Sequence, residues 1–364
     1  MANQKRFAKS WTLGAVLLSS ALMLAACGNN SGGANAGASA STSASAGASG
    51  GKAIKAVFYV DGTLGDKSFF DSAERGMQKA GSELGIDVKT VEGGTNQADW
   101  AAGLESLVSS KKYDVVVVGT SNMTDIVKEL APRYPNEKFI FFDDVISDVP
   151  NVYSMLYSQS EGSFLAGAFA ALATESKDLK GANPDKVIGF VGGMNIPIIN
   201  DFKSGYEQGA KYVDPGVSVI TSYIGDFANA PKGKELALAQ FNGQKADIVF
   251  QVAGGGGLGV LEAGNSLGKY TIGVDSNQNA LYPGSVLTSM MKNIDSSVYR
   301  ALDLFKQGKL TFGKNEVLGI QEGGVGLAKD SLYESHVPKA IQDKMAVIET
   351  KLTNGEIKVQ STLK

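Results

Sequence analysis

The chain has 364 residues, of which 43% are hydrophobic and 20% are charged. This length predicts two domains of ordinary size, and the composition excludes disorder throughout the chain. Lys and Arg number 34 against 37 Asp and Glu, a formal net charge of -3, so no global basic field is available to hold a nucleic acid. The single Cys, Cys27, and the single His, His336, exclude an internal disulfide and a zinc site built from Cys and His.

The first 26 residues have the pattern of an export signal peptide. Lys5, Arg6 and Lys9 form a positive segment, and residues 11–26 form an uncharged, apolar stretch that is short for a membrane span. The stretch ends in LAAC, which resembles a bacterial lipobox, so we expect Cys27 to carry a diacylglyceryl group and further acylation such as palmitate. Two or more acyl chains anchor a protein stably to a membrane. The alternative is an ordinary signal peptide that happens to contain a Cys.

The segment after the expected cleavage site predicts a flexible tether. Removal of residues 1–26 takes away three positive charges, which changes the net charge from -3 to -6. Residues 28–51 contain only Gly, Ala, Ser, Asn and Thr, which cannot bury enough apolar area to become ordered. A coil of this length spans roughly 25 to 30 Å. Residues 27–51 therefore predict a tether on the extracytoplasmic face of the cell membrane.

After the tether, short apolar runs rich in β-branched residues alternate with segments of helical periodicity. One helical segment begins at Phe69, with Ser68 as its expected N-cap and Asp71 three residues later. This alternation predicts parallel sheets that are covered by helices on both faces, which is an α/β fold. The runs expected to form buried strands are residues 56–60, 114–119, 139–142, 187–191, 217–224, 248–252, 271–274 and 286–290.

The pattern of strands and helices restarts near the middle of the chain. Residues 56–62 open the first set of units, and residues 188–193 open a second set. We therefore expect two similar lobes. Because ligands of open parallel sheets bind beyond the carboxyl ends of the strands, two lobes that face each other across these ends would enclose a binding cleft.

Polar and aromatic residues follow the expected strands in both halves. They include carboxylates, amides, aromatic rings and one ammonium, but no metal-ligand cluster and no nucleophile paired with a base. Taken singly, such residues can also cap helices, close turns or pack on the core. The candidate ligand-binding residues are Asp61, Phe69, Phe70, Asp71, Ser121, Asn122 and Asp143 in the first half, and Phe227, Gly254, Gly255, Asp275 and Lys292 in the second half.

The glycine run of the second half also matches a dinucleotide-binding fingerprint. Gly254, Gly256 and Gly259 satisfy G-x-G-x-x-G between an expected strand and helix, and Asp275 follows 21 residues after Gly254. An NAD-dependent enzyme is therefore an alternative from another functional class. The run lies deep in the second half, and NAD is not supplied outside the cell, which argues against this alternative. The glycines predict close backbone approach, either to a ligand or between a helix and a strand.

Motifs over nearly the whole mature chain resemble those of the basic membrane protein family of substrate-binding lipoproteins. The best understood type of this family is the purine nucleoside receptor of ABC transporters. The motifs that carry the resemblance are DKSF at 66–69, EGSFLAG at 161–167, VGGM at 191–194 with Pro197 and Phe202, GKE at 233–235, FQVAGG at 250–255, GVDS at 273–276, LTSMMK at 287–292 and GGVGL at 323–327.

The resemblance implies the type I periplasmic binding protein fold. In this fold two Rossmann-like lobes with parallel sheets are joined by a hinge of three chain crossings and close on a ligand. The expected N-terminal lobe comprises residues 52–153 and about 292–314. The expected C-terminal lobe comprises residues 154–291 and about 315–364.

The resemblance also implies roles for the candidate residues. Phe69 and Phe227 would hold a purine between their rings, and Asp275 and Lys292 would bind the ribose hydroxyls. From the first lobe, Asp61 and Asp143 would face the base or the sugar, with Asp143 able to accept a hydrogen bond from a purine ring N–H. Either Ser121 or Asn122 marks the remaining polar position.

Two positions depart from the family pattern. Phe70 stands where the family usually has Asn, which removes an amide that could contact the base, and Asp71 is the neighbouring residue that could compensate. Gly256 stands where the family often has Thr or Ser. These departures leave the fold unaffected and bear on base selectivity.

The sequence thus predicts a monomeric, lipid-anchored receptor of an ABC importer that binds a nucleoside, with a purine as the expected base. It would use no cofactor and no metal, bind no nucleic acid and perform no catalysis, and its partners would be the permease subunits and the membrane. The alternatives are a sugar receptor of the same fold, the NAD-dependent enzyme, and a surface sensor or adhesin without a transporter.

Overall fold

The computed structural model describes residues 53–363 of the chain. The predicted signal peptide (1–26), the predicted lipidation site Cys27 and the predicted tether (27–51) lie outside the described residues. None of the helices within residues 53–363 combines the length and the apolar composition that a membrane span requires.

Six strands form the first sheet, and all of them are parallel. The order across the sheet is β11-β5-β4-β3-β1-β2. Val, Ile and Phe side chains of the central strands are buried on both faces, as expected for a sheet that helices cover on both sides. The strands are β1 (Lys55–Val60), β2 (Asp87–Glu92), β3 (Val115–Gly119), β4 (Phe139–Phe142), β5 (Val152–Tyr157) and β11 (Asn315–Leu318).

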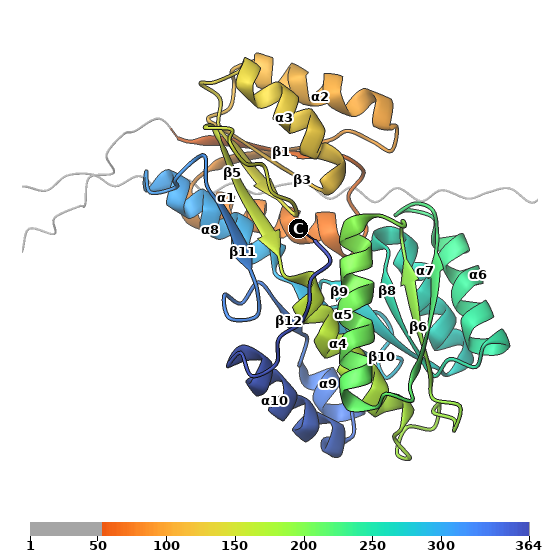
Figure 1. The fold of residues 1–364 in the computed structure, drawn as a ribbon. Helices are drawn as coiled ribbons and strands as arrows, with labels where there is room; N and C mark the ends of the chain where they lie inside the picture. Colours follow the sequence, from red (N-terminus) through yellow and green to blue (C-terminus); the bar gives the residue numbers. More distant parts are fainter. Residues whose placement is uncertain (1–52, 364) are drawn as a thin grey trace, which may run out of the picture. The chain divides into compact units, whose positions relative to one another are not determined.

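Helices cover both faces of this first sheet. Helices α1 (Phe69–Leu84) and α8 (Ile294–Lys306) pack with the face that carries Phe58, and their apolar spacing buries one side of each helix. Helices α2 (Gln97–Ser109) and α3 (Thr124–Arg133) pack on the face that carries Tyr59 (Figure 1).

The second sheet also has six strands, in the order β12-β10-β9-β8-β6-β7. Five of them are parallel, and the short edge strand β12 runs antiparallel to β10. The strands are β6 (Val187–Gly192), β7 (Ser218–Tyr223), β8 (Ile248–Val252), β9 (Tyr270–Asp275), β10 (Val286–Lys292) and β12 (Val325–Leu327).

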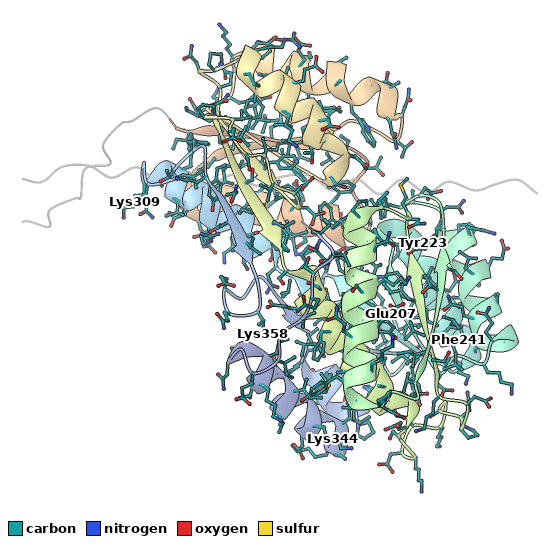
Figure 2. All side chains as sticks on the ribbon, in the orientation of Figure 1. Glu207, Tyr223, Phe241, Lys309, Lys344 and Lys358 are labelled. Carbon is teal, nitrogen blue, oxygen red and sulfur yellow. The ribbon has the colours of Figure 1, made fainter. Side chains whose placement is uncertain are left out.

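Helices also cover both faces of the second sheet. Helices α4 (Gln159–Thr174) and α5 (Pro197–Val213) pack together on one face, and α9 (Ser331–His336) and α10 (Lys339–Thr353) pack on the same side of the lobe. Helices α6 (Ala230–Leu238) and α7 (Gly254–Leu267) cover the other face, where Phe241, labelled in Figure 2, is buried.

The chain crosses between the two sheets three times, after β5, after β10 and after β11. The third crossing is bonded to the other two: the Ser158 amide donates to the Leu318 carbonyl at 3.0 Å, and the Asn293 amide donates to the Gly324 carbonyl at 2.9 Å. The crossings therefore form one hydrogen-bonded hinge. The predicted α/β fold with two parallel-dominated sheets is confirmed.

The crossings occur a few residues later than the sequence suggested. The sequence predicts first-lobe boundaries at 153 and about 314, whereas β5 and β11 pair within the first sheet as far as Tyr157 and Leu318. The sequence also missed β2, β5, β11 and β12. β5 contains Ser154 within its run, β11 exposes Val317, and β2 is a half-exposed edge strand, so none presents a continuous apolar run.

Candidate functional site

A cleft of about 790 Å³ lies between the carboxyl ends of the two sheets. This volume falls within the range of small-molecule binding sites, roughly 300 to 1,000 Å³. Both lobes contribute to its walls, and eleven of the twelve candidate residues line it. They are Asp61, Phe69, Phe70, Ser121, Asn122, Asp143, Phe227, Gly254, Gly255, Asp275 and Lys292.

The two aromatic rings expected to grip a ligand come from opposite lobes. Phe69 begins α1, and its ring packs against Phe142 at 5.5 Å between centroids. Phe227 lies in the loop between β7 and α6, where the Asp226 carboxylate accepts hydrogen bonds from two following amides and fixes the turn. Both rings are half-buried and line the same cleft, so neither is enclosed in the interior of its own lobe.

Lys292, the last residue of β10, forms an ion pair across the lobes. Its ammonium lies 2.5 Å from the Asp143 carboxylate, and its side chain is only 2% exposed. Three rings surround the ammonium, those of Phe69, Tyr157 and Phe202, at 5.6, 5.5 and 4.7 Å from their centroids. Such cation–π contacts are strongest where water is excluded. The Lys292 ammonium is therefore the central group at the hinge end of the cleft, enclosed by one carboxylate and three aromatic rings.

Asp275, the last residue of β9, is also bonded to the opposite lobe. Its carboxylate accepts a hydrogen bond of 2.7 Å from the Ser68 hydroxyl, and the Ser276 hydroxyl donates to the Ser68 carbonyl at 2.8 Å. This contact corrects the expected N-cap: the side chain of Ser68 makes no capping bond. The Asp66 carboxylate accepts from the backbone amides of Ser68, Phe70 and Asp71 instead, and so caps α1.

Three residues at the strand ends adopt the left-handed backbone conformation that non-glycine residues rarely occupy. Thr120, Asp143 and Asp275 have φ values of 76°, 75° and 62°. Each such residue costs of order 1 kcal/mol or more and persists where the surrounding structure holds it. All three line the cleft, whereas the other non-glycine residues with positive φ in the described part of the chain, such as Lys111 and Lys245, lie elsewhere.

Asp61 presents an unpaired carboxylate oxygen at the cleft. One oxygen accepts from the Thr120 hydroxyl at 2.6 Å, whereas Oδ1 is buried without a hydrogen-bond partner among the described residues. Burial raises the pKa of Asp61 to about 7, although the bond from Thr120 opposes this shift. Because Asp61 lines the cleft, this oxygen is in a position to accept a hydrogen bond from a ligand.

The other cleft carboxylates also bind protons more readily than usual. Burial raises the pKa of Asp275 to about 6, against the opposing effects of Lys292 and of the hydrogen bond from Ser68. Burial likewise raises the pKa of Asp143, and Lys292 opposes this shift. The cleft therefore concentrates acidic groups in a poorly solvated space.

The raised pKa of Asp61 predicts a pH-dependent effect of Asp61→Asn. The folded pKa of about 7 lies above the ordinary 3.8, so the folded state binds the proton more tightly, and stability falls as the pH rises from about 4 to about 7. We expect the variant to be more stable than the parent by about 1 to 3 kcal/mol at pH 8 and equal to it near pH 4. Urea unfolding at both pH values measures this difference, and an equal difference at both would contradict the shifted pKa.

Asp71 does not line the cleft. Its two carboxylate oxygens accept from the backbone amides of Gly65, at 2.7 Å, and Lys67, at 3.0 Å, and so fix the loop before α1. Asp71 is therefore not retained as a ligand contact. Phe70 lines the cleft, packs edge-on against Phe69 and lies against Gly62, where a Cβ atom would approach its ring to 2.7 Å.

The glycine run serves two different purposes. Gly254, with φ 52°, and Gly255 line the cleft at the start of α7. Gly259 packs against α6: a Cβ there would lie 1.8 Å from the Ala230 carbonyl oxygen, and a Cβ at Gly233 would lie 2.2 Å from the Gly256 carbonyl oxygen. The predicted close approach was to a ligand or between a helix and a strand, whereas at Gly259 and Gly233 it is between two helices. The resemblance of this run to a dinucleotide fingerprint therefore has a packing explanation.

The sequence did not single out several residues that line the cleft. Trp100 lies in α2, which follows β2, a strand that the sequence does not predict. Phe202 enters the sequence analysis only through a family motif, and Thr120 directly precedes the candidates Ser121 and Asn122. The remaining lining residues are mainly apolar side chains, among them Leu64, Met194, Ile196, Ile198, Ile199 and Leu258. Within residues 53–363 no group of three or more His, Cys, Asp or Glu side chains could hold a metal ion.

Comparison with known proteins decides the family. The model of the Bmp family, described as "ABC transporter substrate-binding protein PnrA-like", matches residues 53–362. The chain belongs to this family. Its members are extracytoplasmic substrate-binding proteins of ABC transporters, so the chain has a ligand and permease partners, and it belongs to a family of binding proteins rather than of enzymes.

Individual relatives agree with this assignment. The chain is 32% identical to basic membrane protein A of Borreliella burgdorferi, over 86% of the chain and 89% of that protein. It is 29% identical to the CD4+ T-cell-stimulating antigen of Listeria monocytogenes, over 94% of the chain and 96% of that protein. Among solved structures, an ABC transporter solute-binding protein from Aeropyrum pernix matches with a TM-score of 0.78 and 25% identity, over 85% of the chain and 94% of that structure.

Proposed function

We propose that this substrate-binding protein captures a nucleoside with a purine base in the interlobe cleft and delivers it to an ABC permease. The observation that carries the proposal is the pair of half-buried rings, Phe69 and Phe227, that line one cleft from opposite lobes. A flat base between two rings gains stacking energy on both faces. Each aromatic contact of this kind contributes about 1 to 3 kcal/mol and excludes water from the base.

The polar residues at the hinge end suit a pentose. Asp275 can accept hydrogen bonds from hydroxyl groups, and the Lys292 ammonium can donate to a hydroxyl or ring oxygen. Hydrogen bonds that involve a charged partner are roughly twice as strong as neutral ones. Asp61 Oδ1, which has no hydrogen-bond partner within residues 53–363, can accept from an N–H or O–H donor of the base or the sugar. Ligand groups would thus replace the missing partner of Asp61.

Closure of the two lobes requires a ligand that contacts both. A ligand shifts a conformational equilibrium only by its difference in affinity for the two states. Phe69, Asp61 and Asp143 face the cleft from the first lobe, and Phe227 and Asp275 face it from the second. A nucleoside that touches both sets would stabilise the closed arrangement.

The charges of the cleft predict discrimination against phosphorylated ligands. The described residues that line the cleft include Asp61, Asp66, Asp143 and Asp275, but only one cation, Lys292, which is already paired with Asp143. A phosphate would enter without a free counter-charge, which is costly in a poorly solvated site. We expect inosine 5′-monophosphate to bind at least about 100-fold more weakly than inosine in calorimetric titrations. Equal affinities would contradict this account of the cleft.

The attachment of the protein belongs to the same proposal. A lipid anchor on Cys27 and a tether of residues 27–51 would hold a monomeric binding domain at the extracytoplasmic face of the cell membrane, close to its permease. Two acyl chains give the stable attachment that one chain does not.

Native mass spectrometry of the protein purified from its own host tests the proposed ligand class. We expect a bound small molecule whose mass, after denaturation and fragmentation, corresponds to a nucleoside. Recovery of a free hexose or pentose would replace the proposal with the sugar receptor of the same fold. Recovery of a dinucleotide would replace it with the enzyme alternative.

A further inference from the structure

The chain after α10 forms a strap that returns to the hinge end of the C-terminal lobe. We define the C-terminal strap as residues 354–363, which follow Thr353, the last residue of α10. In Figure 1 this dark blue segment leaves α10 and runs past β12 to the label C, and Lys358 of the strap is labelled in Figure 2. Ile357 and Val359 pack against the main hydrophobic core, so the strap is docked along part of its length.

Two anchors on α5 hold the strap. The Gln208 side chain donates to the Gln360 carbonyl at 2.8 Å and accepts from the Gln360 amide at 2.9 Å. Two helical turns nearer the cleft, the Asp201 carboxylate accepts from the Ser361 hydroxyl at 2.8 Å and from the Thr362 amide at 2.6 Å. Asp201 is only 1% exposed, so these bonds satisfy a buried carboxylate.

Asp201 connects the strap to the hinge. Its second oxygen accepts from the Gln159 side chain at 2.8 Å, and Gln159 is the first residue of α4, directly after the first crossing. Further along α5 and α4, the helices are held by backbone contact: a Cβ at Gly205 would lie 2.2 Å from the Ser160 carbonyl, and one at Gly209 would lie 1.9 Å from the Phe164 carbonyl. The bond between Asp201 and Gln159 thus holds α5 against α4 at a point one helical turn nearer the cleft than these backbone contacts.

The residue after Asp201 is part of the cleft wall. Phe202 lines the cleft, and its ring lies 4.7 Å from the ammonium of Lys292, the shortest of the three ring distances around that cation. Neither Asp201 nor any residue of the strap lines the cleft. Any effect of these residues on a ligand must therefore act through the position of Phe202 and Lys292.

We propose that Asp201 is a positioning residue, and that the C-terminal strap holds it so that Phe202 and Lys292 keep the geometry in which the cleft binds its ligand. If the strap is removed, the buried Asp201 carboxylate loses its bonds to Ser361 and Thr362. The first turns of α5 must then shift or admit water, because a buried charge does not remain without partners.

Four variants of the full-length protein test this proposal. Asp201→Ala removes the anchor, and a chain that ends at Gln360 removes its strap partners while the anchor at Gln208 remains. Gln208→Ala is the matched control, because it loosens the same strap away from the cleft. Asp201→Asn is the conservative variant: its oxygen can still accept from the strap, and its amide can donate to Gln159 Oε1 once the Gln159 amide flips, because that oxygen is buried without a partner among the described residues.

The first measurement is amide hydrogen exchange in the unliganded proteins. We expect faster exchange at residues 198–203 and 290–294 in Asp201→Ala and in the chain that ends at Gln360, and unchanged exchange there in Gln208→Ala and Asp201→Asn. Unchanged exchange in the first two variants, or equal acceleration in the Gln208 control, would overturn the proposal. This measurement needs no ligand, so it decides the role of the strap whether or not the proposed function holds.

The second measurement is affinity for inosine, which rests on the proposed function. Well below the melting temperature, we expect the Kd to rise about tenfold in Asp201→Ala and in the chain that ends at Gln360, and less than about twofold in the other two variants. A purely structural role would lower the melting temperature and leave the Kd of the folded protein unchanged, which would also overturn the proposal. Failure of the parent protein itself to bind inosine would count against the proposed function alone.

Discussion

Phe227→Ala is expected to weaken nucleoside binding by about 5-fold to 150-fold while the melting temperature of the unliganded protein changes little. The range corresponds to the 1 to 3 kcal/mol that stacking of a base on one ring contributes. The loop that carries Phe227 is fixed by Asp226 and by the bond from the Gly256 amide to the Phe227 carbonyl, neither of which needs the ring. Calorimetric titration and thermal unfolding of the same sample measure both quantities.

Two further variants control for this substitution. Phe227→Trp keeps a flat ring in the cleft, so it should retain most of the affinity. Tyr212→Ala removes a ring that is 46% exposed and packs on Phe164, and it lies outside the cleft, so it should leave the Kd unchanged. If Phe227→Ala binds a nucleoside as tightly as the parent, the aromatic grip on the base is wrong.

Lys292→Met is expected to lower the free energy of unfolding by about 3 to 5 kcal/mol, because it leaves Asp143 buried without its cation. The pair is almost completely enclosed, with side-chain exposures of 2% and 9%, and three rings lie around the ammonium. The same substitution removes the expected hydroxyl contact and should abolish measurable nucleoside binding. Urea unfolding with a two-state fit measures the loss of stability.

A double variant separates the ion pair from simple loss of packing. Adding Asp143→Asn to Lys292→Met removes the orphaned charge, so the double variant should recover a large part of the lost stability. As a control, Lys339→Met breaks the exposed pair with Asp343 on α10, and such pairs contribute about 0 to 1 kcal/mol. If the single and double variants are equally unstable, the interlobe pair does not have the role assigned to it.

The main strands and the division into two sheets could be predicted from the sequence because buried parallel strands are continuous apolar runs. The runs at 139–142 and 248–252 coincide with β4 and β8. The sequence does not predict β2, β5, β11 and β12, because these strands become recognisable only from the strands that they pair with. β11, for example, has one buried residue and becomes a strand only because it pairs with β5 from a distant part of the chain. The first lobe extends beyond residues 153 and 314 for the same reason, because the pairing of β5 and β11 determines where it ends.

The position of most candidate residues followed from the rule that ligands bind at the carboxyl ends of parallel strands. What the sequence did not reveal were contacts between residues far apart in the chain. The sequence predicts Ser68 as a helix cap, whereas its side chain bonds to Asp275, 207 residues away. The sequence also predicts Asp71 as a ligand contact, whereas its carboxylate accepts hydrogen bonds from the loop before α1. The Ser68 contact depends on how the two lobes pack, whereas the Asp71 bonds are local and depend on the conformation of the loop before α1.

The most direct test of the ligand assignment is a calorimetric comparison of inosine with D-ribose, each titrated into the full chain under the same conditions. Two rings that stack on a base and a hinge end that binds a pentose predict a Kd of about 1 μM or tighter for inosine and no measurable binding of ribose at the same concentration. The account would be contradicted if ribose binds while neither inosine nor any other nucleoside binds.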